Sequence, residues 1–152
     1  MAFFSTLAYA GKPVKANELI GFWQADTPDI TDAYTDCYRF FADGRFTFVF
    51  SGYDETKRIV SLSGTYTIKD SVFSFFVTSR EELEGGVVER NPQSSNGWYL
   101  SQGKLRTVKQ PIAGPDEAPL EKMSPAPNGK MCIEIGATKF FKLSPDPNYS
   151  IN

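Results

Sequence analysis

The sequence of 152 residues contains no histidine. Without an imidazole the chain cannot build a serine-histidine-aspartate or cysteine-histidine relay, cannot hold haem iron through histidine, and lacks the usual ligand of a catalytic zinc. Most hydrolase and metalloenzyme designs are therefore excluded, although chemistry based on carboxylates stays open. We expect a protein that is not an enzyme and that carries no cofactor or metal.

Cysteine is also scarce, with only Cys37 and Cys132. Alternation along their strands puts Cys37 on the face of Arg39 and Cys132 on the face of Glu134, which predicts outer, wetter positions for both thiols. A disulfide needs Cα atoms within about 7 Å. Because the two strands are far apart in a simple meander, we favour two free thiols over a bridge.

Two further features are missing. The 16 Lys and Arg residues are interspersed with 18 Asp and Glu residues, for a net charge of -2, so no basic stripe is present to contact phosphate backbones. No apolar run reaches the ~18 to 20 residues of a membrane span. We therefore expect neither nucleic-acid binding nor a membrane span.

Aromatic residues are abundant: they make up 14% of the chain, with 13 Phe and 7 Tyr, mostly in short alternating runs. Alternation of this kind is typical of strands, and the length suits a single domain with a full core. The composition therefore predicts one all-β domain.

Three strand patterns follow one another between residues 34 and 69. Asp43-Gly44 lies between two aromatic runs and predicts a tight hairpin turn. Alternation after the turn places on one face Phe46, Phe48 and Phe50. In the third segment one face, interrupted by Gly64, carries Val60, Leu62, Tyr66 and Ile68. This meander is the predicted centre of the fold.

The other elements are read from shorter signals. A helical turn capped by Asn17 precedes a first strand at 21–25. Further strands are predicted at 72–78, 87–90, 98–100, 104–108, 131–135 and 138–143. Residues 101–103 read as another tight hairpin between their flanking strands, and residues 80–86 as a flexible polar loop. Pairing of the last strand with the first would close the sheet into an antiparallel up-and-down barrel of eight to ten strands.

The N-terminal residues 1–18 precede the barrel domain, which we place at 19–145, with a tail at 146–152. Within them an apolar run ends in Ala8-Tyr9-Ala10, which is typical of a signal-peptide cleavage site, although the positively charged leader is missing. Export to the periplasm or medium is favoured, and the alternative is a hydrophobic segment that packs on a cytoplasmic domain.

Three polar segments are candidates for function. The acidic connection 26–36 lacks the spacing of a calcium loop. Residues 111–129 contain five prolines and are predicted to be a surface crossing, with a flap or docking loop as the alternative. Carboxylates such as Glu81 and Glu82, or either thiol, are candidates for catalysis, although neither thiol has an obvious base nearby in sequence.

The chain resembles the bacterial lipocalin-like domains of the calycin group over residues 19–144. The motifs that carry the resemblance are Gly21-Phe22-Trp23 at the start of the first strand, Asp43-Gly44 with Arg45-Phe46 after it, the segment 62–68, and the closing segment 139–144. The resemblance implies that Trp23 caps one end of the barrel, beneath a basic side chain supplied by Lys139 or Lys142.

The resemblance also implies a small lipophilic ligand inside the barrel or at its mouth. Strand parity predicts an inward set consisting of Tyr38, Phe40, Phe46, Phe48, Phe50, Leu62, Tyr66, Phe73, Phe75, Val77, Ile133 and Phe141. So many large side chains favour a mostly filled interior. The alternative function is an interaction or inhibitor module that binds a protein partner through residues 26–36 or 111–129.

Overall fold

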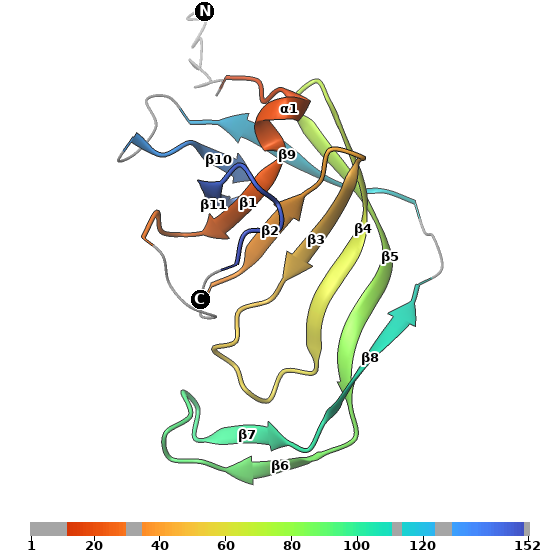
Figure 1. The fold of residues 1–152 in the computed structure, drawn as a ribbon, viewed down its shortest axis with the longest axis vertical. Coiled ribbons are helices and arrows are strands. Elements are labelled where there is room, and N and C mark those ends of the chain that lie inside the picture. Colours follow the sequence, from red (N-terminus) through yellow and green to blue (C-terminus); the bar gives the residue numbers. More distant parts are fainter. Residues whose placement is uncertain (1–11, 30–34, 111–113, 124–128, 151–152) are drawn as a thin grey trace, which may run out of the picture.

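The structure is a computed structural model that describes residues 12–29, 35–110, 114–123 and 129–150. Its elements, drawn in Figure 1, are α1 (Ala16–Leu19), β1 (Gly21–Ala25), β2 (Cys37–Phe40), β3 (Arg45–Val49), β4 (Ile59–Lys69), β5 (Val72–Glu84), β6 (Val87–Arg90), β7 (Trp98–Ser101), β8 (Lys104–Lys109), β9 (Asp116–Lys122), β10 (Cys132–Ile135) and β11 (Thr138–Ser144).

Eight of these strands close into an antiparallel barrel. The order around it is β4-β3-β2-β1-β11-β10-β9-β5, and β5 pairs with β4 again. The predicted pairing of the last strand with the first is present, since Trp23 on β1 lies opposite Lys142 on β11. Closure removes both sheet edges. The predicted all-β, up-and-down barrel is therefore confirmed.

The chain inserts three strands, β6 to β8, between the fifth and sixth barrel strands. β8 pairs with residues 79–84 of β5, and β6 pairs with β7. We call residues 79–109 the arm; Figure 1 shows it at the end of the barrel that lies away from α1. The barrel thus has an α1 end and an arm end.

The arm corrects two sequence expectations. Residues 80–84 are not a flexible loop, because β5 continues to Glu84 and is paired on both sides. Residues 101–103 are not a hairpin, because β7 and β8 pair with different partners. They form a corner of the ribbon, where a Cβ on Gly86 would lie 2.4 Å from the carbonyl oxygen of Ser101.

Strand β9 overturns the expectation of a surface crossing over part of 111–129. It pairs with β5 through residues 116–119 and with β10 through residues 120–122, and Leu120 is fully buried. Pro119 is tolerated because it lies where one ladder ends and the next begins. The next residue, Leu120, supplies an amide donor to the carbonyl of Ser71.

The central meander folds as predicted, with one local addition. Phe41 and Arg45 enclose a three-residue turn in which Gly44 has a φ of +84°. On β4, Ser63 pairs with Ser79 and Gly64 with Val77, so Thr78 is an extra residue that makes a bulge. A Cβ on Gly64 would lie 1.7 Å from the carbonyl oxygen of Phe76, so only glycine fits this bend.

Segments outside the barrel cover its ends and outer wall. The helical turn starts at Ala16 with Lys15 as an N-cap that makes no side-chain bond, so Asn17 is not the predicted cap. The tail residue Tyr149 packs its ring 5.5 Å from that of Phe22 on the outside of β1. Arg39 donates hydrogen bonds to the carbonyl oxygens of Pro147 and Tyr149 and so fixes the tail there.

Candidate functional site

The α1 end of the barrel is sealed around Trp23. This side chain is fully buried, and its Nε1–H donates to the carbonyl oxygen of Leu19 at 2.7 Å. The Nζ of Lys142 lies 5.5 Å from the centre of the Trp23 ring and donates to the carbonyl oxygen of Glu18 at 2.8 Å. Burial lowers the pKa of Lys142 from its ordinary value. The cap therefore consists of a helical turn, an indole and the ammonium group of a partly buried lysine.

The sequence offered Lys139 or Lys142 as the basic side chain over Trp23, and the structure places Lys142 there. Lys139 is exposed and pairs in register with Glu134, on the face opposite to Trp23. The same register corrects one predicted interior residue, because Phe140 joins the core cluster whereas Phe141 faces outward. Two adjacent phenylalanines can exchange roles by a one-residue shift, and pairing with β1 decides which one points inward.

Most of the remaining predicted inward set lies in the barrel core. Five of its members belong to the buried core cluster, namely Phe40, Phe46, Tyr66, Phe73 and Ile133. Four more are partly buried and pack against that cluster, namely Tyr38, Phe48, Phe75 and Val77. Phe50 and Leu62 continue this wall toward the arm end, where Phe50 contacts Phe48 at 5.0 Å and Leu62 pairs with Phe48.

Tyr38 is the meeting point of these rings. Its ring lies between 4.7 and 6.2 Å from five other aromatic rings, which are those of Phe40, Phe46, Phe48, Phe73 and Phe140. Phe73 on β5 and Phe140 on β11 belong to strands that do not adjoin β2, so the Tyr38 side chain reaches across the interior. Burial raises the pKa of Tyr38 from 10.0 to about 12, with a smaller contribution from the Asp36 carboxylate. The phenol is therefore neutral throughout the physiological range.

The Tyr38 hydroxyl has no hydrogen-bond partner among the described residues. Every fully buried side-chain nitrogen or oxygen atom among the same residues has a hydrogen-bond partner. Because the Tyr38 hydroxyl has none, it is not fully buried, and solvent or a ligand can reach it. By contrast, the hydroxyl of Tyr66 at the α1 end donates to the carbonyl oxygen of Phe41 at 3.2 Å. Tyr38 therefore offers an available polar group inside an aromatic wall.

A charged cluster borders this wall at the arm end. Cross-strand pairing continues from Phe48 through Leu62 to Arg80, so the Arg80 side chain starts on the inward face. Its Nε donates to Glu82 at 2.8 Å, and Arg106 of β8 donates to the other oxygen of that carboxylate at 2.6 Å. These bonds hold the pKa of Glu82 below its usual range. The three charges form a polar rim, and a carboxylate bound in this way is a weaker base than a free glutamate.

Both cysteines are free, as predicted, and both lie on the outer barrel face. That face is not wet, because both thiols are buried in a row that runs across four neighbouring strands as Cys37, Gln24, Phe141 and Cys132. The Gln24 side chain donates to the carbonyl oxygens of Thr27 and Asp29, which ties the connection after β1 over this row. Strand β1 is therefore buried on both faces.

Burial also makes the thiols poor nucleophiles. It raises the pKa of the Cys37 thiol from 9.0 to about 11 and raises that of Cys132 in the same direction. Neither thiol is therefore appreciably ionised near neutral pH. Cys37 is on β2 and Cys132 is on β10, and these strands are separated in the barrel by β1 and β11, which puts the two thiols beyond the reach of a disulfide.

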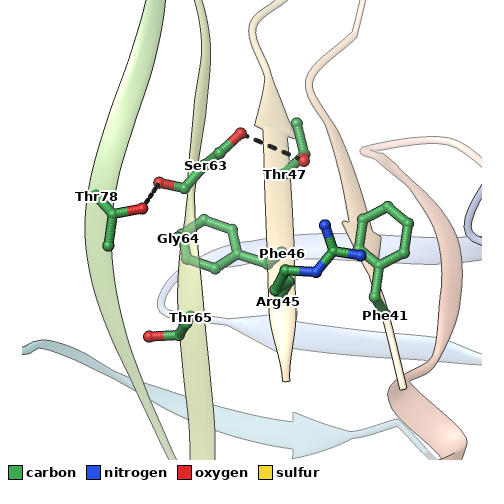
Figure 2. A pocket seen from close by; sticks show the side chains of 8 residues that line it. All are labelled: Phe41, Arg45, Phe46, Thr47, Ser63, Gly64, Thr65 and Thr78. Carbon is green, nitrogen blue, oxygen red and sulfur yellow. Dashed lines mark hydrogen bonds between the residues drawn. The ribbon is translucent and has the colours of Figure 1, made fainter. Parts of the chain in front are cut away.

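A hollow of about 210 Å³ lies on the outer wall where β4 bends at Gly64. Figure 2 shows the side chains that line it. Hydroxyl groups border it, with Thr47 and Ser63 3.4 Å apart and Thr78 donating to the carbonyl oxygen of Ser63 at 3.3 Å. The Arg45 guanidinium at its side lies 5.0 Å from the centre of the Phe41 ring and is paired with Asp43. The polar groups of this hollow are thus largely bound to one another.

The two predicted docking segments are only partly described. Of the acidic connection, residues 30–34 lie outside the described residues; Asp36 accepts a hydrogen bond from the Ser51 amide at 2.7 Å. Of the Pro-rich segment, 111–113 and 124–128 lie outside them, and the signal-like residues 2–10 do as well. Their proposed roles therefore stay predictions.

Sequence reasoning missed two features of the site, the Arg80–Glu82–Arg106 rim and the buried row beneath the β1–β2 connection. Alternation continuing past Thr78 would have been a signal for the first, since Arg80, Glu82 and Glu84 keep the spacing of a strand. The second had no local signal, because the covering segment and the four strands are brought together only by barrel closure.

No protein-family model, curated protein or solved structure matches this chain. In the described part of the chain, no helix is long and apolar enough to cross a membrane. The same residues contain no cluster of three or more acidic or cysteine side chains placed to hold a metal ion.

Proposed function

We propose that this protein is a lipocalin-like barrel that binds a small, mainly apolar ligand carrying one hydrogen-bonding group, with Tyr38 as the polar contact. The observation that carries the proposal is the Tyr38 hydroxyl, which is accessible and unpaired among the described residues although its ring touches five aromatic neighbours. Ligand sites in proteins combine an apolar lining with a few polar groups of this kind.

The contrast between the two ends of the barrel supports a ligand position toward the arm. Trp23, Phe40 and Phe73 are fully buried and fill the α1 side. Tyr38, Phe48 and Val77, nearer the arm end of their strands, are only partly buried. The ligand's apolar body would contact these three residues, and the Arg80–Glu82–Arg106 rim would face its exposed end.

We further propose that the protein is exported and is not an enzyme. The lack of histidine and the raised pKa of both thiols support a binding role over catalysis. Ala8-Tyr9-Ala10 supports export. Expression in a bacterium, with any coding sequence that precedes residue 1 included, and N-terminal sequencing of periplasmic protein should give Gly11 as the first residue. Cytoplasmic protein that retains residues 1–10 would exclude cleavage.

Native mass spectrometry of gently purified protein, followed by organic extraction, tests the ligand proposal first. We expect a discrete adduct that is lost on denaturation. For protein stripped of any adduct, binding of 1-decanol and of a pure hydrocarbon of similar size should then be compared. Saturable binding of neither compound would reject the proposal.

The decisive variant is Tyr38→Phe, which keeps the ring contacts and removes the hydroxyl. We expect it to weaken decanol binding by about three- to tenfold, the usual worth of one hydrogen bond, and to leave hydrocarbon binding unchanged. Tyr99→Phe is the matched control, because its hydroxyl donates to Glu89 on the arm, outside the barrel. Equal effects of the two variants would remove Tyr38 from the site.

A further inference from the structure

The exposed large hydrophobic side chains of the described residues gather at one end of the molecule. They lie on the arm, on the β3–β4 connection beside it, or at the first residue of β4, namely Tyr53, Ile59, Val87, Val88, Trp98 and Leu105. Trp98 is 45% exposed, whereas Trp23 is fully buried. Exposed apolar side chains that cluster in this way mark an interaction surface more often than scattered ones do.

Five side chains form a continuous stripe along one face of the arm. Leu83 on β5 lies opposite Leu105 on β8, and Val88 on β6 lies opposite Leu100 on β7, next to Trp98 on the same face. The two pairs meet at the corner, where a Cβ on Gly103 would lie 3.2 Å from Leu83 and 3.3 Å from Leu100. We call Leu105, Leu83, Leu100, Val88 and Trp98 the arm stripe.

The arm is held firmly enough to present this stripe. The amide of Leu83 donates to the carbonyl oxygen of Arg58, and the Arg58 side chain donates to the carbonyl oxygens of Leu83 and Gly85. Farther out, the amide of Leu100 donates to the carbonyl oxygen of Glu55 at 3.0 Å. In Figure 1 β7 accordingly lies between β6 and the β3–β4 connection.

Charges on the arm are divided between its two faces. Arg90, whose guanidinium lies 5.6 Å from the centre of the Trp98 ring, is at one end of the stripe, and Lys109 shares the face of Leu105 at the other. The carboxylates of Glu82 and Glu84 are on the opposite face and are paired with Arg106. Glu89 is also on the opposite face, bonded to Tyr99. Glu81, which does share the face of Leu83, accepts a hydrogen bond from Ser61.

We propose that the arm stripe docks this protein onto the surface of a membrane that contains anionic lipids. Tryptophan is favoured at the boundary between lipid head groups and acyl chains, where aliphatic neighbours can be buried, and basic residues beside them are attracted to anionic head groups. The apolar stripe with Arg90 and Lys109 at its ends meets both requirements. On β8 only Lys109 shares the face of Leu105, because Lys104 and Arg106 alternate to the opposite face.

A second copy of the chain fits the stripe less well. Because both ends of the stripe carry a cation, two stripes facing each other in either orientation would bring like charges together. Docking on lipid has no such conflict, and it does not require the barrel to hold a ligand.

The test uses vesicles of phosphatidylcholine and phosphatidylglycerol in a 3:1 ratio, with pure phosphatidylcholine for comparison. Trp98 is a reporter at the stripe, because the chain has only one other tryptophan and that residue is fully buried. We expect the protein to float with the anionic vesicles, its emission to shift to the blue, and both effects to weaken with salt. Trp98→Phe should abolish the shift.

Two double variants with the same change in net charge distinguish binding through the arm stripe from general electrostatic attraction to the vesicles. Arg90→Glu with Lys109→Glu should weaken vesicle binding at least tenfold. Lys15→Glu with Lys139→Glu makes the same change in net charge at exposed residues away from the arm and should change binding less than twofold. The proposal is overturned by absence of flotation, by equal losses in both double variants, or by a vesicle-independent, concentration-dependent dimer that shifts Trp98 emission and so assigns the stripe to a second copy.

Discussion

The two tryptophans lie at opposite ends of the molecule and in opposite surroundings. Trp23 is enclosed by α1, the barrel core and Lys142, with its Nε1–H bound to a backbone carbonyl. Trp98 lies on the arm, beside Arg90 and half exposed. The α1 end thus concentrates buried area and satisfied polar groups, while the arm end keeps accessible apolar and polar groups. Stability should depend mainly on the first end, and binding on the second.

The largest test of this contrast is Trp23→Ala against Trp98→Ala. Removing the buried indole leaves a cavity and should lower the free energy of unfolding by about 3–5 kcal/mol. Removing the exposed one should cost about 1 kcal/mol or less. Urea unfolding followed by circular dichroism measures both. Similar losses would show that the arm is an equal part of the core.

Alanine substitutions at Gly64 and Gly114 test the bend of β4 in the barrel wall. Gly64→Ala forces a Cβ against the carbonyl oxygen of Phe76 and should cost about 1–3 kcal/mol, toward the upper end of that range. Gly114→Ala, where a Cβ would meet nothing within 4 Å, is the control and should be nearly neutral. Thermal unfolding of both variants checks this, and a neutral Gly64→Ala would contradict the bend as described.

Alkaline pH should destabilise the protein through groups buried in their neutral forms. Tyr38 keeps its proton up to about pH 12 when folded but releases it near pH 10 when unfolded, so stability falls between these values. Two pKa units correspond to about 2.7 kcal/mol, which is an upper figure for a partly buried side chain. Tyr38→Phe should therefore lose less stability than the natural protein from pH 10 to 12.

Cys37 adds a loss between pH 9 and about 11 that is common to both proteins, since burial raises its pKa as well. The difference between the two unfolding profiles therefore isolates Tyr38. Denaturant titrations at pH 8, 10 and 11.5 measure it, and parallel profiles would mean that the Tyr38 hydroxyl ionises as freely when folded as when unfolded.

The smallest effect is expected at the cap. Lys142→Met removes the ammonium bond to the carbonyl oxygen of Glu18 and should cost about 1 kcal/mol, because the new side chain still covers Trp23. Lys139→Met, at an exposed residue of the same strand, should be neutral. A reversed order in chemical denaturation would return the capping role to Lys139.

The sequence predicted those parts of the barrel whose side chains alternate cleanly. The meander strands and the start of β5 show apolar residues at every second position, and Asp43-Gly44 marks a turn. Strand β9 was not predicted, because its sequence contains Pro119 and four charged residues and shows no alternating apolar pattern. Leu120 is its single fully buried side chain. Its strand character comes from two neighbours distant in sequence, which no local pattern contains.

The site could be predicted as a set of residues but not as an arrangement. Alternation identified Tyr38 as inward, yet two of the rings around it, those of Phe73 and Phe140, come from β5 and β11, whose positions follow from closure. Phe140 and Phe141 are adjacent and equally apolar, so only the register against β1 could assign one to the core. The corner at 101–103 shows the same limit. Turn residues there indicate that the chain changes direction, but they do not indicate which strand β8 pairs with.

The double burial of β1 has a consequence for how the barrel opens. A strand covered by the core on one face and by the Cys37–Phe141 row on the other can leave only when both sets of contacts break, so its amides should be among the slowest to exchange with deuterium. The seam along β9 lacks one amide donor at Pro119 and pairs with β5 over only 116–119. Local opening of the barrel should therefore start at β9. Strand β1 should stay paired with β2 and β11 while the barrel opens.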